Sequence, residues 1–333
     1  MQRNPPWYKN YDYWHSTAKK FIASADYDSL SPEQKTEIIS YGKFSIIKLV
    51  FESNTIEGAG TKTFGETERI LETIQKKYGE KIKTEDFVLL RDGELFSLFG
   101  SHDSELQFAQ SGKSFKEYNE VMQHWGAYIQ SILHVENFLN QIKAKQEVFL
   151  FDREIIKSLH KSLSRGLLEE NDRHLEGQFR DEGIFITGLD LNFPSPELIE
   201  SAMKVFCKRA NLLIHKGLTD NQVDIFMIAA QISYEFVRIH PFVNFNGRMS
   251  RLLLQMVMRC FGIDFCVVLK GNKKSRHRYM ESLRRANAIN NHDNFNSIHL
   301  EPYATLIAMS LCEGFENINA NLKLADLPLI GSE

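Results

Sequence analysis

The short sequence HPFVNFNGR and the three residues after it contain a histidine and two arginines, whose side chains suit phosphate chemistry. His240 opens this sequence, and histidine is the side chain best able to take up a proton near neutral pH. Asn246 and Gly247 lie near its end, where a helix should begin, and the free N–H groups of a helix N-terminus attract anions. Arg248 and Arg251 are three positions apart and therefore share one face of that helix. A base, an anion-binding helix end and two guanidinium groups together indicate phosphate chemistry.

The same residues also have a purely structural interpretation. A His-Pro turn between two helices is common, and arginines after a helix start often only pair with neighbouring carboxylates. The sequence contains neither the phosphate-binding pattern G-x-x-x-x-G-K-[ST] nor the H-R-D loop of protein kinases. Spacing and composition alone leave both interpretations open.

Apolar spacing predicts helices on both sides of this loop and along most of the chain. NQVDIFMIAAQISYEFVRI before the loop is apolar nearly all round, and RMSRLLLQMVMRCFG after it is strongly apolar, which is typical of buried helices. A long helix is expected to start at Pro32 and to stop at Gly58-Ala59-Gly60, and another to start at Thr63 or Gly65. Ile184, Phe185 and Ile186 are strand formers between glycines and predict a short β-hairpin. The predicted fold class is mainly α, with one small β-hairpin.

Composition narrows the class of protein. Lys plus Arg number 40 and Asp plus Glu 43, so the net charge of −3 argues against a general nucleic-acid binder. Hydrophobic residues make up 43 % of the 333 residues, which excludes disorder as the dominant state. The N-terminus lacks the apolar core of a signal peptide, and no window reaches about 20 uninterrupted apolar residues. A cytoplasmic protein without a membrane partner is therefore expected.

The cysteines predict neither disulfides nor a structural zinc site. They are far apart, and none belongs to a C-x-x-C pair. We expect buried thiols in a reducing compartment instead. The four residues are Cys207, Cys260, Cys266 and Cys312.

The sequence HPFVNFNGRMSR resembles the motif of the Fic family, H-P-F-x-[D/E]-G-N-G-R-x-x-R, and matches seven of its nine specified positions. Two companion sequences support the resemblance. GQFRDEGIFITG followed by FPSP is similar to the flap hairpin of the family, and RYMESLRRAN is similar to the helix that closes its adenine pocket. The resemblance covers about 177–290, and the surrounding helices extend it over roughly 120–315.

The resemblance implies a Fic-type helical bundle and transfer of AMP from ATP to a Ser, Thr or Tyr hydroxyl of a target protein, which could be the protein itself. His240 would deprotonate the hydroxyl, while Asn246 and the backbone around Gly247 would cradle the α- and β-phosphates. Arg248 would neutralise phosphate charge, and Arg251 would meet the γ-phosphate. The flap would bind an extended target segment by β-augmentation. The remaining residues with an implied role in nucleotide binding are Thr187, Gly188, Asn244, Phe245, Tyr279 and Asn287.

A second motif lies far upstream. Ser53-Asn54-Thr55-Ile56-Glu57-Gly58 resembles the inhibitory signature [S/T]-x-x-x-E-[G/N] of Fic proteins with an N-terminal inhibitory helix. Ser53 and Glu57 are one helical turn apart, and Gly58 lets the chain turn away. By the resemblance, Glu57 would pair with Arg251 and remove the partner of the γ-phosphate. A solvated glutamate near a helix end is the plain structural alternative.

Two positions depart from the Fic motif. Asn244 replaces the acidic residue that holds Mg²⁺ in the family, and an amide oxygen lacks the negative charge that a hard cation prefers. Phe245 replaces a glycine, and its ring could crowd the phosphates. A slow transferase, a changed preference for donor or metal (Mg²⁺ or Mn²⁺), and a nucleotide-binding module with little catalysis all stay open.

The expected organisation has three parts: an N-terminal helical region at 1–118 carrying the inhibitory helix, a Fic domain at 119–315 and a tail at 316–333. Fic proteins often form homodimers, so a homodimer is expected. Some relatives remove AMP instead of adding it, and the sequence does not separate the two directions. The basic run KGNKKSRHRYMESLRR at 270–285 is better explained as a solvated or nucleotide-facing helix surface than as a nucleic-acid site.

Overall fold

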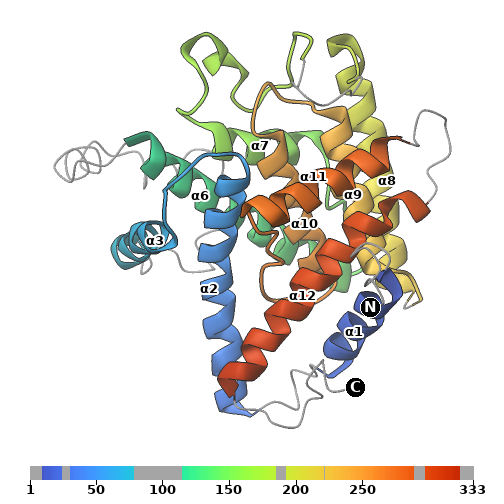
Figure 1. Cartoon of the computed structure of the whole chain (residues 1–333). Coiled ribbons are helices and arrows are strands. Elements are labelled where there is room, and N and C mark those ends of the chain that lie inside the picture. The colour runs from blue at the N-terminus through green and yellow to red at the C-terminus, as the bar shows by residue number, and fades with distance from the viewer. Residues whose placement is uncertain are drawn as a thin grey trace, which may run out of the picture.

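The computed structural model describes residues 10–24, 31–78, 115–184, 193–220, 222–288 and 297–322, and every regular element in these ranges is a helix (Figure 1). The mainly α prediction is therefore confirmed for the part of the chain that the structure describes. The predicted hairpin falls largely on 185–192, outside the described residues, together with Thr187 and Gly188. Its first residue, Ile184, is described and is not in a strand.

Three helices form the N-terminal part, and their ends follow the sequence signals. The helix α2 starts at Pro32 and ends before Gly58, whose φ of 69° is a left-handed conformation that glycine adopts without strain. Thr63 and Glu66 form reciprocal backbone–side-chain hydrogen bonds at the start of α3. The bounds are α1 Tyr11–Ser24, α2 Pro32–Ile56 and α3 Phe64–Tyr78.

The remaining helices correspond to the apolar stretches that predicted them. Two of them begin with a side-chain cap, since Asp152 accepts a backbone N–H at the start of α7 and Asp224 accepts two at the start of α9. The bounds are α6 Phe115–Lys143, α7 Arg153–Ser164, α8 Pro196–Thr219, α9 Ile225–Ile239, α10 Asn246–Cys260, α11 Lys273–Ala288 and α12 Glu301–Leu322, with 3₁₀ turns at Glu170–Leu175 and Ser297–Leu300.

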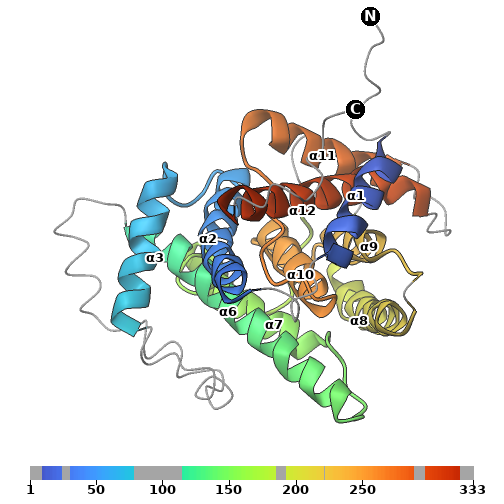
Figure 2. The same cartoon turned by 90° about the horizontal axis from the view of Figure 1, so that it is seen from below.

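The helix α10 is the centre of the fold. Seen from below, it lies inside a ring of helices that includes α2, α6, α7, α8, α9 and α12 (Figure 2). Almost all of its side chains are buried, and its most extensive contacts are with α9 and α6. The Ser250 hydroxyl donates to the Ser233 carbonyl of α9, and Gln255 bonds both backbone groups of Val267. The first turn of α10, which carries the motif, is therefore fixed by the whole core.

A smaller apolar cluster attaches α3 to α2 and α6. Its buried members are Val50, Ile70, Leu71, Ile74, Tyr118, Val121, Met122 and Trp125. Because α2 also packs against α10 and α12, this cluster connects the end of α2 to the core that holds the motif.

Two composition-based predictions can be compared with this fold. All four cysteines are buried and free, as predicted. None of the described helices combines the length and the apolar character that a membrane span requires. The predicted domain boundaries stay predictions.

Candidate functional site

The C-terminal end of α9 presents His240 to a cavity. His240 has a left-handed backbone (φ 50°, ψ 60°), and its N–H bonds the Phe236 carbonyl. Its ring Nδ1 lies 3.0 Å from the Val237 carbonyl oxygen, which can only accept, so Nδ1 carries the proton. The Nε2 atom is consequently an acceptor, which is the form that a general base requires.

Burial keeps the His240 ring neutral. Desolvation, helped by the nearby charge of Arg180, lowers the pKa of His240 to about 4, although its hydrogen bond to Val237 and the charge of Glu57 act in the opposite direction. The ring of Phe193 packs 4.8 Å from the imidazole, centroid to centroid. At neutral pH His240 is therefore unprotonated at Nε2, which is the state that a general base requires.

A cavity of ≈ 430 Å³ lies in front of His240, which is large enough for a nucleotide-sized ligand. Its walls come from the 240–247 loop, the end of α9, the end of α2 and one face of α11. Along that face of α11, an arginine at each end flanks one aromatic and two aliphatic side chains. The lining residues contributed by α11 are Arg276, Tyr279, Met280, Leu283 and Arg284.

The first turn of α10 forms the floor of this cavity, and a carboxylate already lies against it. A Cβ atom placed on Gly247 would collide with Glu57 Oε1 and would lie 3.3 Å from Arg251 Nη1. Only glycine leaves room for an anionic group at this helix N-terminus, where the dipole and the free N–H groups favour negative charge. The Glu57 carboxylate therefore sits where an anionic ligand would be bound.

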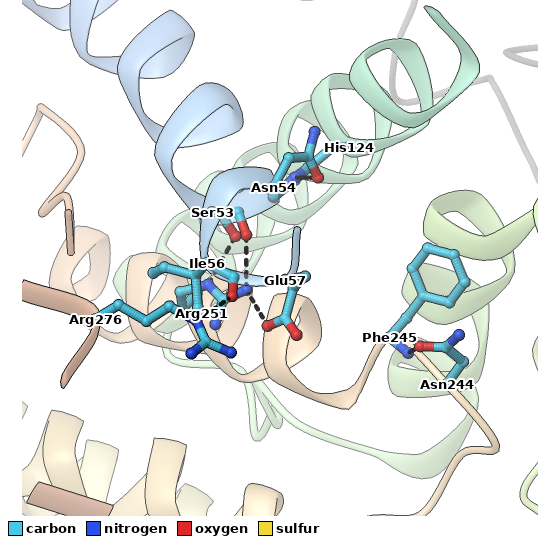
Figure 3. A network of polar contacts seen from close by, with 9 residues as sticks. All are labelled: Ser53, Asn54, Ile56, Glu57, His124, Asn244, Phe245, Arg251 and Arg276. Carbon is cyan, nitrogen blue, oxygen red and sulfur yellow. Dashed lines mark hydrogen bonds and ion pairs between the residues drawn. The ribbon is translucent and has the colours of Figure 1, made fainter. Parts of the chain in front are cut away.

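The partner of this carboxylate is Arg251, which is 1 % exposed. Its Nη2 atom lies 2.6 Å from Glu57 Oε1 and 3.0 Å from the Ser53 carbonyl oxygen. Its Nε atom donates to the Ser53 hydroxyl at 2.7 Å (Figure 3). The predicted contact between Glu57 and Arg251 is present, and Ser53 completes it with two further hydrogen bonds.

The charges of three arginines act on the Glu57 carboxylate, and Arg251 is the one paired with it. Burial opposes its ionisation, but Arg251, Arg248 and Arg276 hold the pKa of Glu57 below its ordinary value. The Glu57 side chain is 35 % exposed, and it lines the cavity. Arg276 also donates from Nε to the Ile56 carbonyl at 2.7 Å, which binds the end of α2 to α11 (Figure 3).

Buried polar contacts hold the end of α2 against α6. The Glu120 carboxylate accepts the Gly60 N–H at 2.5 Å, and the Asn54 amide donates to the Glu120 carbonyl. His124 Nδ1 lies 3.1 Å from Asn54 Oδ1 (Figure 3). Burial lowers the pKa of His124 well below its ordinary value, so this ring is neutral and Nδ1 donates. These contacts fix the turn that carries Glu57.

The Asn246 side chain holds the loop itself. Its Oδ1 accepts the Phe242 N–H at 3.1 Å, and its Nδ2 donates to the Phe242 carbonyl at 2.7 Å. Both amide groups are thus engaged within the protein. Its assignment to phosphate binding stays a prediction.

The residues at the loop do not fit a protein-bound magnesium ion. The Asn244 oxygen accepts the Phe245 N–H at 2.7 Å, and it carries no negative charge. The carboxylate of Glu57, which lines the same cavity, is paired with Arg251. Among the described residues, no three His, Cys, Asp or Glu side chains gather into a metal-binding cluster.

The other predicted site residues have different positions. Tyr279 lines the cavity, is 3 % exposed, and has its ring 5.8 Å from the Arg251 guanidinium carbon. Arg248 is 5 % exposed and does not line the cavity; its guanidinium lies over the Phe245 ring. Asn287 belongs to the last turn of α11, and its side chain is outside the description.

Two further residues that no sequence motif indicates take part in the site. Arg180 donates to the carbonyls of His240, Glu182 and Pro194, so it ties these two residues to the His240 backbone. His160 of α7 accepts the Gly177 N–H and lies 3.3 Å from the Asn244 carbonyl oxygen. A single sequence gives no spacing signal for such long-range contacts.

A protein-family model for the Fic/DOC family matches residues 150–258, from the start of α7 almost to the end of α10. A Fido domain-containing protein of Dictyostelium discoideum is 33 % identical over 111 residues, which are 33 % of this chain and 71 % of that protein. Two proteins named "Protein adenylyltransferase Fic" align over 186 residues, or 55 % of this chain. The one from Aedes aegypti is 26 % identical and covered over 32 % of its length, and the one from Nematostella vectensis is 28 % identical and covered over 38 %. The chain thus aligns with about a third of the length of these two adenylyltransferases.

Solved structures share the fold over nearly the whole chain. A Fic domain containing signaling protein from Bacteroides thetaiotaomicron has a TM-score of 0.62 at 19 % identity, covering 94 % of this chain and 98 % of its own. Fic-1 from C. elegans has a TM-score of 0.58 at 21 % identity, covering 96 % and 73 %. The family model covers the chain from α7 into α10, including His240 and the loop that follows it, and the solved structures show the same fold. The chain therefore belongs to the Fic/DOC family.

Proposed function

We propose that this protein is a protein adenylyltransferase that Glu57 holds in an inactive state. One observation carries the proposal: the Glu57 carboxylate lies against Gly247 and Arg251, in the same cavity that the His240 ring lines. A general base and an anion site that share one cavity suit transfer of a phosphorus-containing group. The distant relationship to proteins named adenylyltransferases supports AMP as that group.

In the proposed reaction, His240 acts as the base and the start of α10 binds the phosphates. His240 Nε2 takes the proton of a Ser, Thr or Tyr hydroxyl of the target protein, and the hydroxyl oxygen attacks the α-phosphorus of ATP. A bond forms between this oxygen and the α-phosphorus, and the bond between the α-phosphorus and the bridging oxygen breaks. Pyrophosphate leaves with that oxygen. The N-terminal N–H groups of α10 and the Arg251 guanidinium stabilise the phosphate charge.

Inhibition follows from competition for the same groups. A γ-phosphate that binds Arg251 must displace the Glu57 carboxylate, which already satisfies that guanidinium. Arg251 is almost fully buried, so its charge requires an anionic partner at all times, either Glu57 or a phosphate. Removal of Glu57 should therefore favour the productive position of ATP.

In this proposal the protein itself contributes no carboxylate ligand to magnesium at the loop. Neither Asn244 nor another described side chain offers a free carboxylate at the loop, so the ion would reach the site with the ATP phosphates. No step of the reaction above is assigned to it.

A nucleotide-binding module is the second candidate, and the two departures from the motif favour it. Asn244 lacks the charge of an acidic residue, and Phe245 adopts a left-handed backbone with φ of 65°, which a bulky residue disfavours. If these changes abolish transfer, ATP should still bind to the Glu57→Gly protein without forming an adduct. Removal of AMP from a modified protein would use the same cavity, with Glu57 orienting the water.

The experiment compares the wild-type protein, Glu57→Gly and the double variant Glu57→Gly with His240→Ala. Each is incubated with ATP and Mg²⁺ or Mn²⁺, and intact-protein mass spectrometry detects an AMP adduct. We expect the adduct to appear or to increase in Glu57→Gly and to be absent from the double variant. Binding of ATP without any adduct would transfer support to the binding module. Loss of a pre-installed AMP that depends on Glu57 would support the reverse reaction.

A further inference from the structure

Phe245 directs its ring into the core. The residue precedes α10 with φ 65° and ψ 3°, a conformation that bulky residues rarely adopt. Its side chain is nevertheless only 5 % exposed, with the ring 6.1 Å from the His160 ring in an edge contact. Figure 3 shows the ring turned away from Glu57 and Arg251. The ring therefore lies away from Glu57 and Arg251, although Phe245 lines the same cavity. Crowding of the phosphates by this ring stays a prediction.

The Arg248 guanidinium packs over this ring. The guanidinium carbon of Arg248 lies 3.8 Å from the centre of the Phe245 ring, well inside the range of a cation–π contact. Arg248 and Phe245 thus form one buried pair at the first turn of α10. Phe245 lines the cavity, whereas Arg248 does not.

Among the residues that the structure describes, no carboxylate forms an ion pair with Arg248. Its Nε and Nη1 atoms are buried without a hydrogen-bond acceptor, and neither Glu57 nor Glu120 lies within ion-pair distance of it. Burial lowers the pKa of Arg248 to about 10, so the side chain stays charged at neutral pH. A buried cation with unmet donors is unfavourable, and an anion would satisfy it.

We propose that Phe245 is a positioning residue that holds the Arg248 guanidinium on its ring until a polyphosphate enters the cavity. The inference rests on the proposed function, because the polyphosphate is the triphosphate chain of the donor. Binding then moves the guanidinium from the ring to the phosphates at the N-terminus of α10. The aromatic face of Phe245 competes with the donor for Arg248, so Phe245 lowers donor affinity. A glycine at this position, as in the family motif, offers no such competitor.

The test uses Phe245→Leu, which keeps an apolar side chain at the strained position but removes the aromatic face. Phe245→Met serves the same purpose if the leucine variant folds poorly. Phe236→Leu is the matched control, because Phe236 is fully buried on α9 and does not line the cavity. Circular dichroism establishes that each variant is folded.

The first measurement is the NMR resonance of the Arg248 Nε–H group, assigned by its loss in Arg248→Lys. Stacking on Phe245 should shift this resonance upfield in the free wild-type protein, and tripolyphosphate should move it downfield. In Phe245→Leu the resonance should have an ordinary position, whereas Phe236→Leu should resemble the wild type. An ordinary position in the wild-type protein would overturn the proposal.

The second measurement is the affinity for inorganic tripolyphosphate by calorimetry. Loss of the competing ring should make Phe245→Leu bind roughly threefold to tenfold more tightly than the wild type. Equal or weaker binding, or no binding to either protein, would contradict this role of Phe245. Failure of the proposed function is a separate result, because it would leave tighter tripolyphosphate binding and the shifted resonance intact while no AMP is transferred.

Discussion

The guanidinium of Arg251 donates a 2.6 Å hydrogen bond to the carboxylate of Glu57, a residue 194 positions away in the chain. The two residues come from the end of α2 and the start of α10, so the contact joins the N-terminal helices to the motif. Because Arg251 is 1 % exposed, the state of this one contact decides whether its charge is satisfied by the protein or by a ligand.

Loss of the Glu57 charge should destabilise the fold even if the same change activates the enzyme. Glu57→Gln leaves the buried Arg251 without its ion pair, and we expect the free energy of unfolding to fall by about 2 kcal/mol, less than for a fully buried pair because Glu57 is partly exposed. Urea denaturation measures this loss. Excess ATP should restore stability in Glu57→Gln more than in the wild-type protein. Equal stabilisation of both proteins by ATP would contradict competition for Arg251.

Gly247→Ala tests the position of the carboxylate without any enzyme assay. The added methyl group would collide with Glu57 Oε1, so the substitution should cost about 1–3 kcal/mol in the wild-type protein. In the Glu57→Gly background the collision partner is absent, and the higher helix propensity of alanine should make the same change neutral or favourable. Equal costs in both backgrounds would mean that the carboxylate lies elsewhere.

Ser53 should contribute through its two hydrogen bonds to Arg251. Ser53→Ala removes the hydroxyl that accepts from Nε but keeps the backbone carbonyl that accepts from Nη2. We expect a loss of about 1 kcal/mol in stability and an activation smaller than that of Glu57→Gly. Ser45→Ala, which removes another buried hydroxyl of α2, serves as the control for stability alone. Activation by Ser45→Ala to the same degree would show that general loosening of α2 is the cause.

Acid should unfold this protein through its buried histidines. Burial lowers the pKa of His160 to about 3 and of His240 to about 4, against about 6.5 in an unfolded chain. Between the folded and unfolded pKa values only the unfolded state binds the protons. The contribution of the neutral histidines to the free energy of unfolding is therefore fully present above about pH 6.5. It falls as the pH decreases below that value, by about 1.4 kcal/mol per pH unit for each histidine. The pH dependence of the unfolding free energy measures the proton number. His160→Gln should reduce the slope by one proton, and an unchanged slope would refute the assignment.

Restoring the acidic residue should restore metal dependence. Asn244→Asp keeps the oxygen that accepts the Phe245 N–H and adds a negative charge beside the cavity. The Mg²⁺ concentration that half-saturates ATP binding should fall about tenfold. Asn272→Asp is a suitable control, because Asn272 also accepts a backbone N–H, from Ser275, but does not line the cavity. The same effect in both variants would indicate a general charge effect.

Much of the helical framework could be predicted from the sequence. The entry at Pro32, the stop at Gly58 and the two apolar helices around the loop follow from local rules, and the structure reproduces them. The contact between Glu57 and Arg251 could also be anticipated, since two separate motifs pointed to it. Their role in catalysis and inhibition stays a proposal.

The arrangement around Phe245 could not be predicted in the same way. A left-handed phenylalanine is disfavoured locally, and only the surrounding core, with His160 and Arg248 on the ring, stabilises it. The loop-holding role of Asn246 has the same origin, because its partner Phe242 is oriented by the loop and not by a helical or strand repeat. Tertiary packing decided both.

The most direct test follows the two ends of ATP separately in the Glu57→Gly protein. ATP labelled at the α-phosphate and ATP labelled at the γ-phosphate are supplied in parallel, and the label that stays on protein is measured. An adenylyltransferase retains the α label and releases the γ label with pyrophosphate, and His240→Ala in the same background abolishes retention. Retention of the γ label, or of an α label that survives His240→Ala, would contradict AMP transfer by this site.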